Sequence, residues 1–183
     1  MKIALDFDST VWPLLPAMGI SYDEVTYWGH LPDMLGGIEG MNQAFTEVMP
    51  FDYAVHHPPF PSCVETLQEL DSQGVEIHII THREECYHDD VVRYTQHYGI
   101  PVHNLDCSPH VDKVGACLDR GINILVDDHP DIAMQAAGQG LDAYMLLFQY
   151  NHHAQEHGVT GCQNWSELGV HIQKSLGLHN PEA

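Results

Sequence analysis

The sequence is poor in basic residues. Among its 183 residues, six are Lys or Arg and 26 are Asp or Glu, which gives a formal net charge of −20 with the 15 histidines counted as neutral. Charged residues make up 17% of the chain, below the roughly 25% usual in soluble domains, so the acidity reflects missing Lys and Arg. Because an acidic surface repels phosphate backbones and anionic lipids, nucleic acid polymers and membranes are poor partners. Any phosphate that the chain binds must rely on very few cations or on a metal ion.

Long hydrophobic runs and paired cysteines are also missing. No stretch approaches the ~18 apolar residues of a transmembrane helix, and the first apolar run, in MKIALD, is too short for a signal peptide. The five cysteines are odd in number and form no CxxC pair, which favours reduced thiols and a cytoplasmic protein. With 44% apolar residues, the chain is globular in composition and long enough for one domain with a small insertion.

Short apolar runs alternate with amphipathic stretches, a pattern typical of a parallel β-sheet wrapped by helices. The sequence predicts strands at 3–7, 75–80, 102–105, 122–126 and 143–148. It predicts helices at 62–73, 84–98, 113–119, 130–137 and 165–176. We therefore expect an α/β fold with a three-layer, Rossmann-like parallel sheet.

The interval between the first two predicted strands is too long for a simple βαβ unit, which needs about 30 residues. About 50 residues, 12–60, remain unassigned there and are rich in Gly, Pro and aromatic residues. We expect residues 12–60 to form a small, mostly helical cap on a core made of 1–11 and 61–183. Ligands in open α/β sheets bind beyond the carboxyl ends of the strands, so the cap would cover such a site.

Polar side chains follow three of the predicted strands. They are Asp6 and Asp8 after the first strand, Thr81 after the second, and Asp127 and Asp128 after the fourth, with Lys113 on the approach to that strand. Since the carboxyl ends of parallel strands converge on one edge, the four carboxylates would repel one another unless a hard cation such as Mg²⁺ lay among them. The remaining oxygens of a phosphoryl group would then be held by Lys113 and Thr81.

These residues and their order resemble the four motifs of the haloacid dehalogenase (HAD) superfamily of phosphotransferases. The stretch DFDSTV at 6–11 is similar to the DxDx(T/V) motif, and Thr81, Lys113 and the Asp127–Asp128 pair match the second, third and fourth motifs. The resemblance covers about residues 1–150. Within the superfamily, the stretches HPPFP at 57–61, IITHR at 79–83 and LFQYN at 147–151 look most like the 5'(3')-deoxyribonucleotidase-like group, including its bacterial and phage members.

The resemblance implies a Mg²⁺-dependent phosphomonoester hydrolase in which Asp6 attacks phosphorus to form an aspartyl-phosphate and Asp8 is the general acid and base. It implies that Mg²⁺ is held by Asp6, the Asp8 backbone carbonyl, Asp127 and Asp128. The expected substrate is a small phosphorylated molecule, specifically a nucleoside 5'-monophosphate. A sugar phosphate or phosphoglycolate as substrate, and a catalytically silent HAD-fold binding protein, are the alternatives. The sequence leaves a homodimer open.

Other patterns allow more than one interpretation. In the cap, Tyr27 and Trp28 could stack on a nucleobase or form the small core of the insertion. Arg83 could be a surface residue or a phosphate contact. The run HHAQEH contains an HxxEH zinc-peptidase pattern at 153–157, and a second possible metal cluster consists of His82, Cys86 and His88 with Asp89 and Asp90. An acceptor Asp with Thr and Lys also occurs in response-regulator receivers, which would be shorter and lack the insertion.

Overall fold

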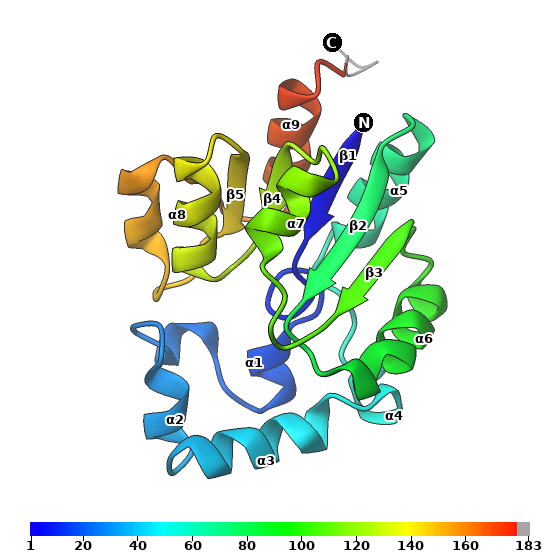
Figure 1. The fold of residues 1–183 in the computed structure, drawn as a ribbon. Coiled ribbons are helices and arrows are strands. Elements are labelled where there is room, and N and C mark those ends of the chain that lie inside the picture. The colour runs from blue at the N-terminus through cyan, green and yellow to red at the C-terminus, as the bar shows by residue number, and fades with distance from the viewer. Residues whose placement is uncertain (179–183) are drawn as a thin grey trace.

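The computed structural model describes residues 1–178 and contains a six-stranded parallel sheet in the order β3-β2-β1-β4-β5-β6 (Figure 1). The strands are β1 (Lys2–Leu5), β2 (Glu76–Thr81), β3 (Asn104–Cys107), β4 (Ile124–Val126), β5 (Asp142–Leu146) and β6 (Thr160–Cys162). The predicted α/β class and parallel sheet are confirmed. The edge strand β6 was missed because its three residues, Thr-Gly-Cys, carry no run of apolar or β-branched side chains.

Helices cover both faces of the sheet, which makes the three expected layers (Figure 1). One face carries α5 (Cys63–Ser72), α6 (His88–Tyr98) and α9 (Trp165–Ser175), and the other carries α7 (Lys113–Asp119) and α8 (Pro130–Gly138). Strand residues alternate between the two layers, as a pleated strand requires: Leu5 and Val126 pack into the first, and Ala4 and Leu125 into the second. Short 3₁₀ segments lie at η2 (Glu85–Tyr87) and η3 (His152–His157). Within residues 1–178, no helix combines the length and the apolar character needed to cross a bilayer.

The order of the strands creates a crevice beside β1. From β1 the chain runs outward through β2 and β3, then returns to place β4 on the other side of β1. Leu5 is in register with both Ile79 of β2 and Val126 of β4. The loops that leave β1 and β4 therefore diverge at their carboxyl ends, which is where ligands bind in open α/β sheets.

The segment between β1 and α5 is helical, as the sequence predicts for most of residues 12–60. It contains α1 (Leu14–Ala17), η1 (Tyr22–Glu24), α2 (His30–Met34), α3 (Ile38–Val48) and α4 (Phe51–Ala54). We call residues 12–60 the insertion; Figure 1 shows its helices lying across the carboxyl ends of β1 and β2. Its two ends are tied together where the buried Trp12 donates its indole N–H to the Ala54 carbonyl at 3.3 Å.

Candidate active site

A cavity of about 590 Å³ lies between the carboxyl edge of the sheet and the insertion. Its lining includes all six polar residues that the sequence places at strand ends: Asp6, Asp8, Thr81, Lys113, Asp127 and Asp128. The strand order explains the convergence, because β1 lies between β2 and β4 and all three strands end at the same edge. We call these six residues the floor of the cavity.

Lys113 joins two of the floor carboxylates. Its ammonium lies 2.7 Å from Asp6 Oδ1 and 2.8 Å from Asp127 Oδ2, and the lysine is only 4% exposed. Lys113 is the first residue of α7, and this helix start is fixed by Asp112, whose side chain accepts a hydrogen bond from the Gly115 N–H. The N-cap of α7 thus places Lys113, a type of residue that is ordinarily exposed, beneath the carboxyl end of β1.

Burial and crowding perturb the ionisation of these groups. Burial raises the pKa of Asp6 to about 7, even though the Lys113 ammonium opposes the shift. Burial also raises the pKa of Asp128 well above its ordinary range, and the negative charges of Asp6 and Asp127 add to the effect. For Lys113, burial acts to lower the pKa, but the two carboxylates prevail and raise it. The ammonium therefore stays charged, while the carboxylates lack enough positive charge to ionise together at neutral pH.

The same carboxylates fit a hard divalent cation. Asp6, Asp127 and Asp128 can each offer one oxygen so that the three atoms lie within 4.8 Å of one another. Lys113 and the Tyr150 hydroxyl, which donates to Asp128 Oδ2 at 2.6 Å, satisfy one oxygen on each of Asp6 and Asp128. The other oxygen of each accepts no hydrogen bond from residues 1–178. An all-oxygen set with these unused acceptors and excess negative charge suits Mg²⁺.

Asp8 is held in a different way from Asp6. Arg83 donates from Nε to both carboxylate oxygens, at 3.1 and 3.0 Å, and from Nη2 to Oδ1 at 2.7 Å. The arginine is 3% exposed, and its guanidinium carbon lies 4.7 Å from the ring centre of Phe7 and 4.8 Å from that of Trp12. Such a bidentate, stacked pair fixes the position of the Asp8 carboxyl group. The sequence allows Arg83 to be either a surface residue or a phosphate contact. In the structure it is buried and paired with Asp8.

The loop after β1 is tightly turned, which gives Asp6 and Asp8 their different directions. The Phe7 carbonyl accepts hydrogen bonds from the N–H groups of Val11 and Trp12, both at 2.9 Å, and Ser9 N–H donates to the Trp12 carbonyl at 2.7 Å. Ser9 adopts a positive φ of 57°, uncommon for a residue with a side chain. Beside this loop, the buried Thr81 accepts a hydrogen bond from the Arg83 N–H at 3.3 Å and lines the cavity.

Asn151 holds Asp128 in place. Its side-chain amide donates to the carbonyls of Asp128, at 3.1 Å, and Leu146, at 3.0 Å, while its oxygen accepts from the Phe148 N–H at 2.9 Å. The adjacent Tyr150 donates to the Asp128 carboxylate. The LFQYN stretch therefore connects β5 to the floor. Sequence reasoning used this stretch only for resemblance and did not identify these two supporting residues.

No family model matches this chain. A Bacillus cereus protein named "Putative nucleotidase" is 31% identical over 121 residues, which cover 64% of this chain and 62% of that protein. A solved HAD family hydrolase from Deinococcus radiodurans R1, with bound phosphate and sodium, superposes with a TM-score of 0.69 at 12% identity, over 97% of this chain and 96% of that one. The D,D-heptose 1,7-bisphosphate phosphatase from B. bronchiseptica, complexed with magnesium and phosphate, gives 0.58 at 14% identity, over 96% and 99%. The chain has the HAD fold.

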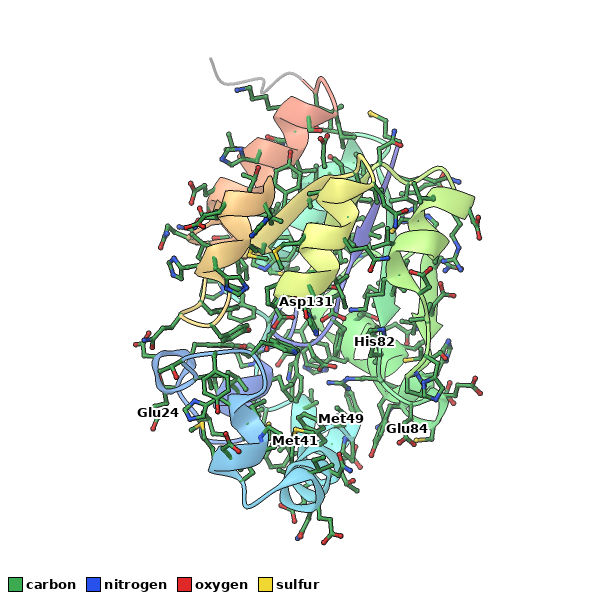
Figure 2. The ribbon with its side chains drawn as sticks, turned by 60° about the vertical axis from the view of Figure 1, so that its left-hand side comes forward. Glu24, Met41, Met49, His82, Glu84 and Asp131 are labelled. Atoms are coloured by element: carbon green, nitrogen blue, oxygen red, sulfur yellow. The ribbon has the colours of Figure 1, made fainter. Side chains whose placement is uncertain are left out.

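The HAD fold confirms the resemblance that the motifs indicated, at the level of architecture. In this fold the insertion forms the roof of the cavity, and its lining side chains are mostly apolar. The apolar ones are Leu14, Leu15, Val25, Trp28, Leu31, Pro32, Met41, Phe45 and Met49, and the polar ones are Asn42 and Thr46. In Figure 2, Met41 and Met49 lie on the insertion below the sheet, and His82 and Glu84 lie on the core beside the opening.

The two aromatic residues proposed for the cap lie in different surroundings. Trp28 lines the cavity, is 45% exposed, and has its ring centre 3.9 Å from that of His129 and 5.5 Å from that of Tyr150. Tyr27 stacks on His30 with ring centres 4.8 Å apart, and its hydroxyl donates to the Asp33 carboxylate. The structure therefore brings Trp28, but not Tyr27, to the floor residues.

The histidine patterns do not form metal sites within residues 1–178. The HxxEH run lies in the 3₁₀ helix η3 (His152–His157), whose three residues per turn do not put positions i and i+4 on one face. Over the same residues, Asp6, Asp127 and Asp128 make the single group of three or more ligands whose donor atoms converge. His82, Cys86 and His88 are not part of it.

Proposed function

We propose that the chain is a Mg²⁺-dependent phosphomonoester hydrolase that works through an aspartyl-phosphate on Asp6 and acts on nucleoside 5'-monophosphates. The observation that carries the proposal is the link from Lys113 to Asp6 and Asp127 at the floor, with Asp8 two residues from Asp6. A nucleophilic carboxylate, a buried cation, an acid–base group and an all-oxygen metal site thus meet in one cavity. Phosphoryl transfer depends chiefly on such positioning and charge neutralisation.

In the first half-reaction, a carboxylate oxygen of Asp6 attacks phosphorus in line with the ester oxygen. The oxygen–phosphorus bond to Asp6 forms, the ester bond breaks, and the leaving oxygen takes a proton from the carboxylic acid form of Asp8. During this step Lys113, whose pKa is raised by its two carboxylate neighbours, and the Thr81 hydroxyl donate hydrogen bonds to phosphoryl oxygens. When bound, Mg²⁺ would offset the negative charge of the phosphoryl oxygens and the floor carboxylates.

In the second half-reaction, water attacks the phosphorus of the aspartyl-phosphate. The Asp8 carboxylate, held by Arg83, accepts the proton of that water, and the bond from phosphorus to Asp6 breaks. The products are inorganic phosphate and a regenerated Asp6 carboxylate. The proton now on Asp8 is the one that the next leaving group receives, so the cycle balances.

The nucleotide part of the proposal rests on two observations. The Bacillus cereus relative carries a nucleotidase name, and Trp28 presents an aromatic ring to the cavity beside His129. A flat base can stack on such a ring. The volume of about 590 Å³ is within the usual range for a small-molecule site.

A phosphate-release screen tests the proposal. It compares nucleoside 5'- and 3'-monophosphates, sugar phosphates and phosphoglycolate, with MgCl₂ and with EDTA. We expect Mg²⁺-dependent release with 5'-nucleotides preferred, reversible loss in EDTA, and no release by Asp6→Asn. The matched control is Asp131→Asn, an exposed first-turn residue of α8 that does not line the cavity. A preference for sugar phosphates would contradict the nucleotidase assignment, and no turnover of any ester would contradict the enzyme assignment.

A further inference from the structure

The distribution of positive charge in this protein limits what else the substrate can carry. All six Lys and Arg residues fall within residues 1–178, and two of them, Arg83 and Lys113, line the cavity. The other four lie elsewhere: Lys2 reaches the Arg120 carbonyl, Arg93 pairs with Asp52, Arg120 pairs with Asp106, and Lys174 is exposed on α9.

Both cavity cations are already committed to the floor. Lys113 forms ion pairs with Asp6 and Asp127. Arg83 donates hydrogen bonds from Nε and Nη2 to the Asp8 carboxylate, and from Nη1 to the Met49 carbonyl at 3.2 Å. No lysine or arginine in residues 1–178 is left to meet an anionic group beyond the phosphate that is cleaved.

The cavity also carries an excess of negative charge. Five carboxyl groups line it, the four of the floor and Glu84, which Figure 2 places beside the opening. With all five ionised, a bound divalent cation and the two basic side chains would offset four of these charges, and the phosphate itself adds more. The far side of the cavity is mostly apolar, with residues such as Leu31, Met41 and Phe45, and the polar side chains there, Asn42 and Thr46, carry no charge. A second anion on the substrate would there lose part of its hydration and meet no lysine or arginine, which is unfavourable.

We infer that the substrate is a phosphomonoester whose only anionic group is the phosphate to be cleaved, and that esters with a second phosphate or a carboxylate are rejected by the cavity. This inference rests on the proposed phosphatase activity of the same site. It names the substrate class by charge: a terminal monophosphate on an uncharged, flat or apolar group.

Three small esters test the inference on the full chain with Mg²⁺. These are phenyl phosphate, 4-carbamoylphenyl phosphate and 4-carboxyphenyl phosphate, of which the last two have nearly the same shape but differ by one negative charge. At pH 8, where an ordinary imidazole is neutral, we expect kcat/KM for the carboxylate to be at least about tenfold below that of the amide. Thymidine 3',5'-bisphosphate is expected to fall below thymidine 5'-monophosphate in the same way.

A charge placed on the roof makes the test specific to the cavity. Met41→Lys is expected to narrow the gap between the carboxylate and the amide several-fold, whereas Met41→Gln leaves it unchanged. Equal kcat/KM for carboxylate and amide in the wild type, or a gap that Met41→Lys does not alter, would overturn the inference. These results differ from failure of the proposed function, which would show as no hydrolysis of phenyl phosphate itself.

Discussion

The floor and the roof of the cavity are built by opposite means. On the floor, Asp6, Lys113 and Asp127 are at most 6% exposed and are joined by short ion pairs. On the roof, no residue from 26 to 47 is buried, and the eleven-residue helix α3 buries only Val48. The floor is therefore fixed by interactions that cannot be removed singly without leaving a buried charge unpaired. The roof can change many side chains at little cost in stability, so we expect the core to carry the proposed chemistry and the insertion to carry the fit to the substrate.

One residue connects the two regions. Arg83 leaves the end of β2, holds Asp8 on the floor, and donates to the Met49 carbonyl at the end of α3. Its planar guanidinium lies against Phe7 and Trp12. The position of the insertion and the direction of the Asp8 carboxylate are thus set by the same side chain.

The largest effect is expected from removing the floor cation. Lys113→Met keeps the length and bulk of the side chain but leaves Asp6 and Asp127 without their partner. We expect activity to fall by at least about 10³-fold, since the charge of the phosphoryl group is no longer offset. The free energy of unfolding at pH 8 should fall by about 3–5 kcal/mol. At pH 6 the loss should be smaller, because protonation of Asp6 removes part of the repulsion. Urea unfolding at both pH values measures it.

Lys174→Met is the matched control, because it makes the same substitution at an exposed position on α9. Its unfolding free energy should stay within about 0.5 kcal/mol of the wild type. If the two variants were equally stable at pH 8, the comparison would fail, because the floor would then tolerate single changes as the roof does.

The sequence predicted the floor because simple chemistry marks it. Carboxylates that close a buried strand are costly to bury without a function, and parallel strands bring such ends together. The insertion was predicted from the excess length between Asp8 and Thr81 alone. The sequence predicts that residues 12–60 are mostly helical but gives neither the individual helices nor their packing against the core, because few of their residues are buried.

What the sequence could not supply is the partner of each side chain. The sequence is equally compatible with an Arg83 that faces solvent. Its pairing with Asp8 depends on the turn that follows β1 and on the stacking of two aromatic rings. Tyr27 and Trp28 are neighbours of the same type, yet only Trp28 faces the cavity. That difference is set by the tertiary position of the loop before α2 and leaves no periodic signal.

A smaller effect is expected on the roof, and it should change binding rather than chemistry. Trp28→Ala should raise KM for a nucleoside 5'-monophosphate about tenfold, since stacking of one base contributes ~1–3 kcal/mol. Its kcat should stay within about twofold, and its stability within about 0.5 kcal/mol, because the side chain is 45% exposed. Steady-state kinetics and thermal melting measure these quantities.

The neighbouring Tyr27→Ala serves as the control, since that ring stacks on His30 away from the floor. We expect its KM to remain within about twofold of the wild type. If Trp28→Ala lowered kcat as strongly as Lys113→Met, the assignment of fit to the roof and chemistry to the floor would be wrong.

The smallest expected effect is a pH dependence in how Mg²⁺ stabilises the floor. Asp6 has a folded-state pKa of about 7 against an ordinary value of 3.8, so in the metal-free protein its stabilising contribution, present at low pH, is lost as the pH rises through about 7. Mg²⁺ binds the ionised carboxylate and must displace this proton below that pH. At pH 6 the gain from Mg²⁺ should therefore be about 1.4 kcal/mol smaller than at pH 8, or roughly 3–6 °C in Tm. Thermal melting with excess MgCl₂, and with NaCl at matched ionic strength, measures the difference. Asp6→Asn, which cannot titrate at this position, should show a smaller pH dependence, of which Asp128, whose pKa burial also raises, supplies the remainder, whereas equal shifts at both pH values in the wild type would show that Asp6 does not bind the metal.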